Sequence, residues 1–187
     1  DLLLIHQAFG DYYGTYRAMQ KALEAGKVRA IGLSNFVDAR FVDLVENMEV
    51  KPAVLQLETH VFSQQKRMRE LMAPYGTRLM AWAPLAEGRN GIFTHPTLTA
   101  IGAKYGKTAA QTALRFLMAE DVIAIPKSVH RERLVENFSI DDFELSAEDL
   151  DAIRALDGGK PMFADFNDPT LAKFLLEYDA KFNPERQ

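Results

Sequence analysis

The sequence predicts an α/β fold with a parallel sheet, and two observations support that prediction. Short apolar runs alternate with longer amphipathic stretches along most of the chain, as strands and helices do around a parallel sheet. Polar residues follow the apolar runs, at the sheet edge where α/β proteins build their sites. Since no glycine-rich phosphate turn follows an early strand, the pattern favours a barrel over a doubly wound sheet.

The apolar runs are short, aliphatic and followed by polar or turn residues, as buried parallel strands are. They give about five strand–helix units, whereas a closed barrel needs eight. The chain therefore resembles the back part of a (β/α)8 TIM barrel. The predicted strands lie at residues 2–5, 28–33, 53–57, 78–83 and 122–125.

The stretches between these runs are predicted as helices, because apolar residues recur in them at three- and four-residue spacing. Gly26 stands just past the first of them, a common position for a terminating glycine. Thr108 with Gln111 forms a capping-box pattern, and Ser146 begins another capped start with acids in its first turn. The predicted helices span residues 13–25, 38–48, 64–73, 96–105, 108–119, 146–156 and 171–178.

The last predicted strand leads through a polar loop into a further helix. Pro126 ends the strand because it has no N–H to donate, and Ser128 is predicted to cap the helix that follows. In that helix Leu134, Val135 and Phe138 fall at helical spacing behind a charged face.

This loop gathers cations and a hydroxyl at a helix start, where anions bind. The groups are Lys127, Ser128, Arg131 and Arg133. They suit a phosphate monoester on a nucleotide better than a bare pyrophosphate. A solvated helix start with ordinary surface charges is the alternative interpretation.

Composition narrows the class of protein. The 187 residues, 48% of them hydrophobic, suffice for one core, and we expect a single domain over 1–187 that ends in a loop or tail at 160–187. The net charge of -4, with scattered basic residues, disfavours nucleic acid and membranes as partners. With no cysteine and scattered histidines we expect no metal site, and a cytoplasmic location.

Several short strings follow one another in a fixed order and spacing. They are LIHQ at 4–7, GKVRAIGLSNF at 26–36, QLETH at 56–60, WAPL at 82–85, IPKSV at 125–129, ENF at 136–138 and DFELS at 142–146. In this order they resemble the C-terminal part of the aldo-keto reductases, NADPH-dependent carbonyl reductases built on a (β/α)8 barrel. The resemblance is greatest to the bacterial branch that includes diketogluconate reductases, which has a tryptophan at the position of Trp82.

The resemblance implies roles at the nicotinamide end of an NADP(H) cofactor. Ser34, Asn35 and Gln56 would hold the carboxamide, to which their side chains offer neutral donors and acceptors. Trp82 would stack on the nicotinamide ring, and His6 would orient and polarise the substrate carbonyl. His60 and His95 have no such role in the family and are expected to be structural.

The resemblance also implies the phosphate end of the site. The backbone of residues 85–88 would line the pyrophosphate, while Lys127, Ser128 and Arg133 would bind the 2′-phosphate and so favour NADPH over NADH. Residues 136–137 would face the adenine. The complete expected cofactor set is Ser34, Asn35, Gln56, Trp82, Ala83, Leu85, Glu87, Gly88, Lys127, Ser128, Val129, His130, Arg133, Glu136 and Asn137.

The family's acid is a tyrosine tuned by a lysine and an aspartate, and the resemblance implies that all three precede Asp1. Tyr12, Tyr13 and Tyr16 do not match the acid's position. We therefore expect a fragment that lacks the ~10²–10⁴-fold contribution of acid catalysis and is not competent alone. With its upstream segment the protein would be a monomer that reduces aldehydes and ketones to alcohols by hydride transfer.

Two alternatives stay open. One is a non-catalytic member of the family that binds or senses NADPH. The other is an unrelated TIM-barrel enzyme with a phosphate site after its last strand, for which NADPH would not quench Trp82 fluorescence. The particular carbonyl substrate is not predicted, because loops that shape such pockets would lie upstream.

Overall fold

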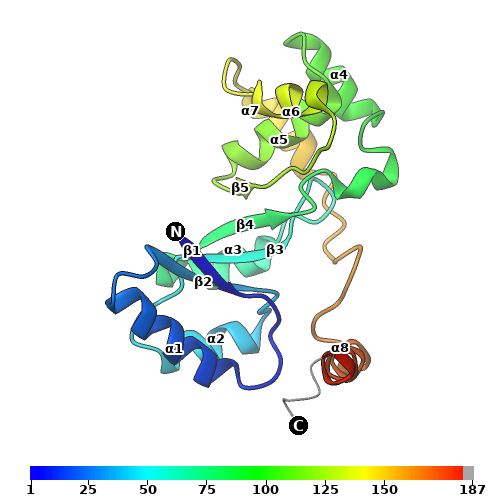
Figure 1. Cartoon of the computed structure of the whole chain (residues 1–187). Coiled ribbons are helices and arrows are strands. Elements are labelled where there is room, and N and C mark those ends of the chain that lie inside the picture. Colours follow the sequence, from blue (N-terminus) through cyan, green and yellow to red (C-terminus); the bar gives the residue numbers. More distant parts are fainter. Residues whose placement is uncertain (183–187) are drawn as a thin grey trace. The chain divides into compact units, whose positions relative to one another are not determined.

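The computed structural model describes residues 1–182, and the side chains of residues 1–178 (Figure 1). Strands and helices alternate, as predicted. The strands are β1 (Leu2–Ile5), β2 (Ala30–Ser34), β3 (Val54–Glu58), β4 (Arg78–Trp82) and β5 (Ile123–Ala124). The helices are α1 (Tyr12–Glu24), α2 (Ala39–Asn47), α3 (Lys66–Met72), α4 (Pro96–Lys104), α5 (Ala109–Ala119), α6 (Arg131–Phe138), α7 (Ala147–Arg154) and α8 (Pro169–Phe182), with 3-10 segments η1 (Ala73–Tyr75) and η2 (Ala86–Gly91).

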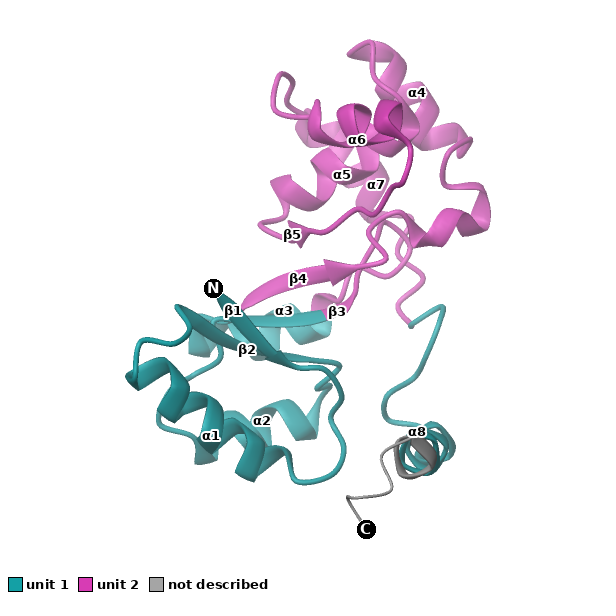
Figure 2. Ribbon diagram, viewed as in Figure 1, with its two compact units in different colours: residues 1–56, 67–77, 161–187 teal, residues 57–66, 78–160 magenta. Residues whose placement is uncertain are grey.

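The parallel α/β architecture is confirmed. The strand order is β1-β2-β3-β4-β5, so neighbours in the sheet are also neighbours in the chain, as in part of a (β/α)8 barrel. The chain forms two compact units (Figure 2): unit 1 comprises residues 1–56, 67–77 and 161 onward, and unit 2 comprises residues 57–66 and 78–160.

In unit 1 the register brings the carboxyl ends of three strands together. Leu4 pairs with Gly32, and Ser34 pairs with Gln56. A side chain at position 32 would not fit, because a Cβ there would lie 2.7 Å from the carbonyl oxygen of Val54. Glycine at this position therefore lets β2 approach its neighbours closely.

The core of unit 1 lies between its strands and the helices that follow them. Ile31 and Leu33 of β2 are fully buried, as are Phe41 and Leu44 of α2 and Tyr16 of α1. Figure 2 shows α1 and α2 side by side beneath β1 and β2. Burial of such side chains contributes roughly 1.5–3 kcal/mol each.

In unit 2, β4 pairs with β5 in parallel, with Met80 opposite Ile123. The predicted capping box of α5 is confirmed: Thr108 Oγ1 accepts the Gln111 N–H at 3.2 Å, and the Gln111 side chain accepts the Thr108 N–H at 3.1 Å. The predicted cap of α7 is confirmed as well, since Ser146 Oγ accepts a backbone N–H at 3.2 Å.

Two predictions around β5 are wrong. The strand comprises two residues only, both half-buried, and Ile125 is exposed, because β5 ends the sheet order and pairs with β4 alone. Ser128 does not cap α6. Its hydroxyl accepts the His130 N–H at 3.1 Å in a turn, and His130 takes the N-cap position without a side-chain cap.

The apolar face of α6 is not part of the core. Leu134, Val135 and Phe138 have exposed fractions of 49%, 56% and 83%. Further along, the predicted helix 171–178 lies within α8, and residues 183–187 of the predicted tail lie outside the described residues. None of the helices described is both long and apolar enough to cross a membrane.

Candidate functional site

The predicted carboxamide-binding residues of unit 1 come together where β2 and β3 end. Ser34 pairs with Gln56 across the two strands, and the Asn35 N–H donates to the Gln56 carbonyl at 2.9 Å. Asn35 Nδ2 donates to the His6 carbonyl at 3.2 Å, which ties the exit of β1 to the exit of β2. The sheet register therefore places all four predicted residues at one edge.

This group contains two features that a ligand site explains. Ser34 is 1% exposed, yet its hydroxyl has no hydrogen-bond partner among the described residues. A buried hydroxyl without a partner costs about 1–3 kcal/mol. Asn35 adopts a left-handed backbone with φ 63°, a conformation that asparagine tolerates better than most residues. The Ser34 hydroxyl is therefore available to a ligand that offers a hydrogen-bonding group.

His6 follows β1 directly and its side chain is exposed. Its backbone carbonyl is fixed by Asn35, whereas its imidazole is accessible at the sheet edge. A histidine in this position can donate a hydrogen bond to a carbonyl oxygen on which negative charge develops.

Two tyrosines that follow β1, Tyr13 and Tyr16, have raised pKa values, which makes their hydroxyls poor acids. A hydrogen bond from Tyr13 to Asp43, 2.6 Å long, raises the pKa of Tyr13 to about 12. Burial raises the pKa of Tyr16. Proton transfer is most effective when the pKa of the acid lies near the working pH, so neither hydroxyl suits that role.

In unit 2, the half-buried Trp82 ends β4 and a loop with unusual backbone follows. Ala83, Ala86 and Glu87 have φ values of 51°, 48° and 49°. The left-handed conformation costs a residue other than glycine roughly 1–2 kcal/mol, and such strain clusters at functional sites. The Gly88 N–H donates to the carbonyl of Leu85 at 2.9 Å, which closes the loop on itself.

The predicted 2′-phosphate residues also lie in unit 2, between β5 and the first turns of α6. Lys127, Val129, His130 and Arg133 are exposed, and Ser128 is half-buried. Among the described residues His130 pairs with Glu132 at 3.7 Å, and neither predicted phosphate-binding cation forms an ion pair.

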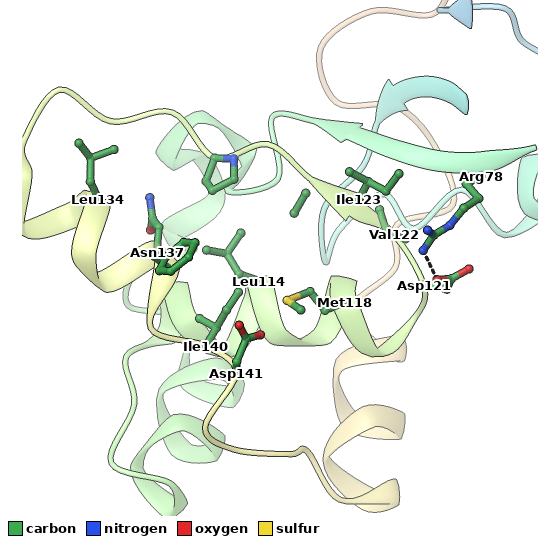
Figure 3. A pocket seen from close by; sticks show the side chains of 13 residues that line it. Arg78, Leu114, Met118, Asp121, Val122, Ile123, Leu134, Asn137, Ile140 and Asp141 are labelled. Atoms are coloured by element: carbon green, nitrogen blue, oxygen red, sulfur yellow. Dashed lines mark hydrogen bonds and ion pairs between the residues drawn. The ribbon is translucent and has the colours of Figure 1, made fainter. Parts of the chain in front are cut away.

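The two predicted adenine residues have different surroundings. Glu136 accepts a hydrogen bond from the Thr108 hydroxyl at 2.6 Å, at the N-terminus of α5. Asn137 lines a pocket of about 530 Å³ formed by β5, α5 and α6 (Figure 3). This pocket is lined mainly by apolar side chains, such as Leu114 and Phe138, and the Arg78–Asp121 ion pair lies at its border.

Sequence reasoning missed a buried pair in unit 2. The Glu58 carboxylate and the His60 imidazole contact each other at 3.2 Å and are 3% and 0% exposed. Their spacing of two residues, at the end of an apolar run, was the available signal. Side chains two positions apart on an extended strand point to the same side.

Taken together, the unit 1 cluster and the unit 2 loops define an α/β protein with its polar residues at the carboxyl ends of parallel strands. Residues 1–158 match the sequence profile of the Aldo/keto reductase family. The chain belongs to this family, which confirms the resemblance found in its motifs. An unrelated TIM-barrel enzyme is thereby excluded.

Individual relatives agree with this assignment. Glyoxal reductase of Bacillus subtilis (strain 168) is 43% identical over 157 residues, which are 83% of this chain and 56% of that protein. MGS-M4, an aldo-keto reductase from a Medee basin deep-sea metagenome library, superimposes with a TM-score of 0.85 at 38% identity, over 90% of this chain and 63% of that one.

A second solved structure is the Gox0644 D53A mutant in complex with NADPH. It superimposes with a TM-score of 0.84 at 34% identity, over 89% of this chain and 62% of that one. The chain thus spans less than two thirds of the length of each of these proteins.

Proposed function

We propose that this chain carries the cofactor-binding part of an NADPH-dependent oxidoreductase that reduces aldehydes or ketones to alcohols. The observation that carries the proposal is the cluster of the buried Ser34 and Asn35 with the half-buried Gln56, in which the Ser34 hydroxyl has no hydrogen-bond partner in the described chain. A nicotinamide carboxamide offers both a donor and an acceptor to such a hydroxyl. Family membership supports the same cofactor, as does the similar Gox0644 D53A mutant, which was solved in complex with NADPH.

When bound, the nicotinamide supplies the hydride. In unit 1, the cluster would hold the carboxamide, and His6 would donate a hydrogen bond to the substrate carbonyl. In unit 2, Trp82 would stack on the nicotinamide ring. Lys127, Ser128 and Arg133 would bind the 2′-phosphate, and the loop after β4 would line the pyrophosphate. The preference for NADPH follows from the cations, which would lose their partner in NADH.

The proposal also covers the proton donor, the substrates and the cellular location. We do not assign the acid to Tyr13 or Tyr16, because the pKa of each is raised away from the working pH. Small polar aldehydes are the first substrates to test, since a relative is named glyoxal reductase. A cytoplasmic monomer is part of the proposal, and a sequence without cysteine is compatible with a reducing compartment.

The test is a titration of the purified chain with NADPH, followed by the fluorescence of Trp82, the single tryptophan. We expect saturable quenching, with NADH binding more weakly. Ser34→Ala removes one hydrogen bond to the carboxamide and should weaken binding about fivefold. In the free protein it removes an unpaired buried hydroxyl and should stabilise the fold by about 1 kcal/mol.

Thr112→Val is the matched control, because the Thr112 hydroxyl is buried but donates to the Thr108 carbonyl at 2.9 Å. This variant should lose stability and keep its affinity for NADPH. Absence of quenching in the unmodified chain, or equal affinity for NADPH and NADH, would contradict the proposal.

A further inference from the structure

Both ring nitrogens of the buried His60 form hydrogen bonds, one of them with Glu58. The His60 ring is completely buried, and its Nε2 lies 3.2 Å from Glu58 Oε1. On the opposite side of the ring, Nδ1 accepts the backbone N–H of Phe62 at 3.2 Å. Because Nδ1 is an acceptor here, the ring proton is on Nε2 and is donated to the carboxylate. The hydrogen bonds thus fix both the tautomer and the ring orientation.

The pair lies at the start of the turn that follows β3. His60 and Ser63 exchange two backbone hydrogen bonds of 3.1 and 3.0 Å. The Gln65 side chain returns to the Glu58 carbonyl at 2.7 Å, although its own backbone has a positive φ of 55°. These bonds connect residues 58–60 to residues 63–65, so the turn is held next to the Glu58–His60 contact.

Thr59 stands between the two members of the pair and connects them to Trp82. Its N–H donates to the Trp82 carbonyl at 3.2 Å, and its hydroxyl donates to the Leu57 carbonyl at 3.1 Å. Residues 58, 59 and 60 alternate in direction along the extended chain. When the imidazole and the carboxylate are fixed on one side, the peptide N–H of Thr59 between them is fixed as well.

We infer that Glu58 and His60 are positioning residues for Trp82. The Glu58–His60 hydrogen bond sets the backbone at Thr59, and the bond from Thr59 to the Trp82 carbonyl sets the end of β4 from which the indole projects. The consequence for NADPH rests on the proposed function, whereas the effect on Trp82 itself does not. A buried polar pair contributes little net stability compared with an apolar pair but fixes a single arrangement, which suits a positioning role.

The test uses variants that separate the two hydrogen bonds of the imidazole. His60→Asn keeps an acceptor near Nδ1 and loses the donor to Glu58. His60→Gln keeps an amide donor near Nε2 and loses the acceptor. Glu58→Gln keeps an oxygen acceptor without the charge. Since the sequence has one tryptophan, the emission maximum and the near-ultraviolet circular dichroism report on Trp82 alone.

Asp149→Asn is the matched control. Asp149 is another buried carboxylate of unit 2, 2% exposed, which accepts hydrogen bonds from Lys104 and Tyr105. Its removal should lower the unfolding temperature without changing the Trp82 spectra. His60→Asn should change the spectra and weaken NADPH binding about fivefold. His60→Gln should restore most of the affinity, to within about twofold of the original chain.

The outcomes separate the inference from the proposed function. If the unmodified chain does not bind NADPH, the proposed function fails and the spectra still decide the role of the pair. If His60→Asn leaves the Trp82 spectra unchanged, or if Asp149→Asn changes them equally, the inference is wrong. A nitrogen NMR measurement on the unmodified chain needs no variant: a proton on Nδ1 of His60 would overturn the inference.

Discussion

The two predicted ends of the cofactor site are built in different ways. In unit 1, Ser34 and Asn35 are 1% and 4% exposed and are held by strand register and backbone hydrogen bonds. In unit 2, Lys127 and Arg133 are exposed side chains that form no ion pair in the described chain. The first group is ordered before any ligand arrives, whereas long flexible cations must be ordered by the ligand itself.

Because of this difference, substitutions in the two regions should affect folding stability and cofactor affinity to different extents. Substitutions in the buried cluster should change stability as well as binding: the Asn35 side chain ties β2 to the exit of β1, whereas the unpaired Ser34 hydroxyl costs stability until a ligand binds it. Exposed cations contribute little to folding, since surface charges far from a partner are worth only tenths of a kcal/mol. Substitutions in the two regions should therefore change different measured quantities.

The largest expected effect is on stability, at Asn35. Asn35→Val loses the side-chain hydrogen bond to the His6 carbonyl and places a β-branched residue at a φ of 63°. We expect the free energy of unfolding to fall by about 3 kcal/mol, measured by urea denaturation. Asn35→Gly is the control, because glycine adopts this backbone without strain and should lose only about 1 kcal/mol. Equal losses in both variants would contradict the strain argument.

The next effect is on affinity, at the exposed cations. Lys127→Ala and Arg133→Ala each remove a charge-assisted hydrogen bond, and NADPH binding should weaken about tenfold for each variant. NADH binding and the unfolding temperature should change little. Lys160→Ala, which removes another exposed cation of unit 2, is the control and should leave both affinities unaltered. A loss shared by NADPH and NADH would place the cations away from the 2′-phosphate.

Local signals predicted the elements and the sheet edge at which several polar residues meet. The apolar runs marked the strands, and the Thr108–Gln111 pattern marked the start of α5, because both depend on residues adjacent in sequence. The polar residues after β1, β2 and β3 were predicted to meet, since parallel strands end at one edge. The contacts of Ser34 and Asn35 with neighbouring strands agree with that expectation.

Features that depend on distant neighbours could not be predicted. The length of β5 and the exposure of the apolar face of α6 depend on what else packs against them. Ser128 could cap a helix or close a turn, and the choice is set by where α6 begins. The pairing of His60 with Glu58 depends on a turn whose closure by Ser63 no local pattern shows.

The smallest effect concerns acid pH and compares a buried with an exposed carboxylate. Burial alone would raise the pKa of Asp149, but hydrogen bonds from Lys104 and Tyr105 outweigh it and lower that pKa below its ordinary value. The Lys107 ammonium lowers the pKa of Asp142, whose side chain is 67% exposed. A carboxylate with a lowered pKa stabilises the folded state above its unfolded pKa, and this stability is lost as pH falls through the folded pKa.

Both carboxylates should therefore contribute to the loss of stability below about pH 4, where unfolded aspartate becomes protonated. Solvent screening weakens the contribution of the exposed Asp142, so Asp149→Asn should flatten the dependence of unfolding temperature on acid pH more than Asp142→Asn does. Thermal unfolding of both variants from neutral to acid pH checks this expectation. Equal flattening would mean that burial does not separate the two sites, and the contrast between buried and exposed polar groups would then not extend to acid stability.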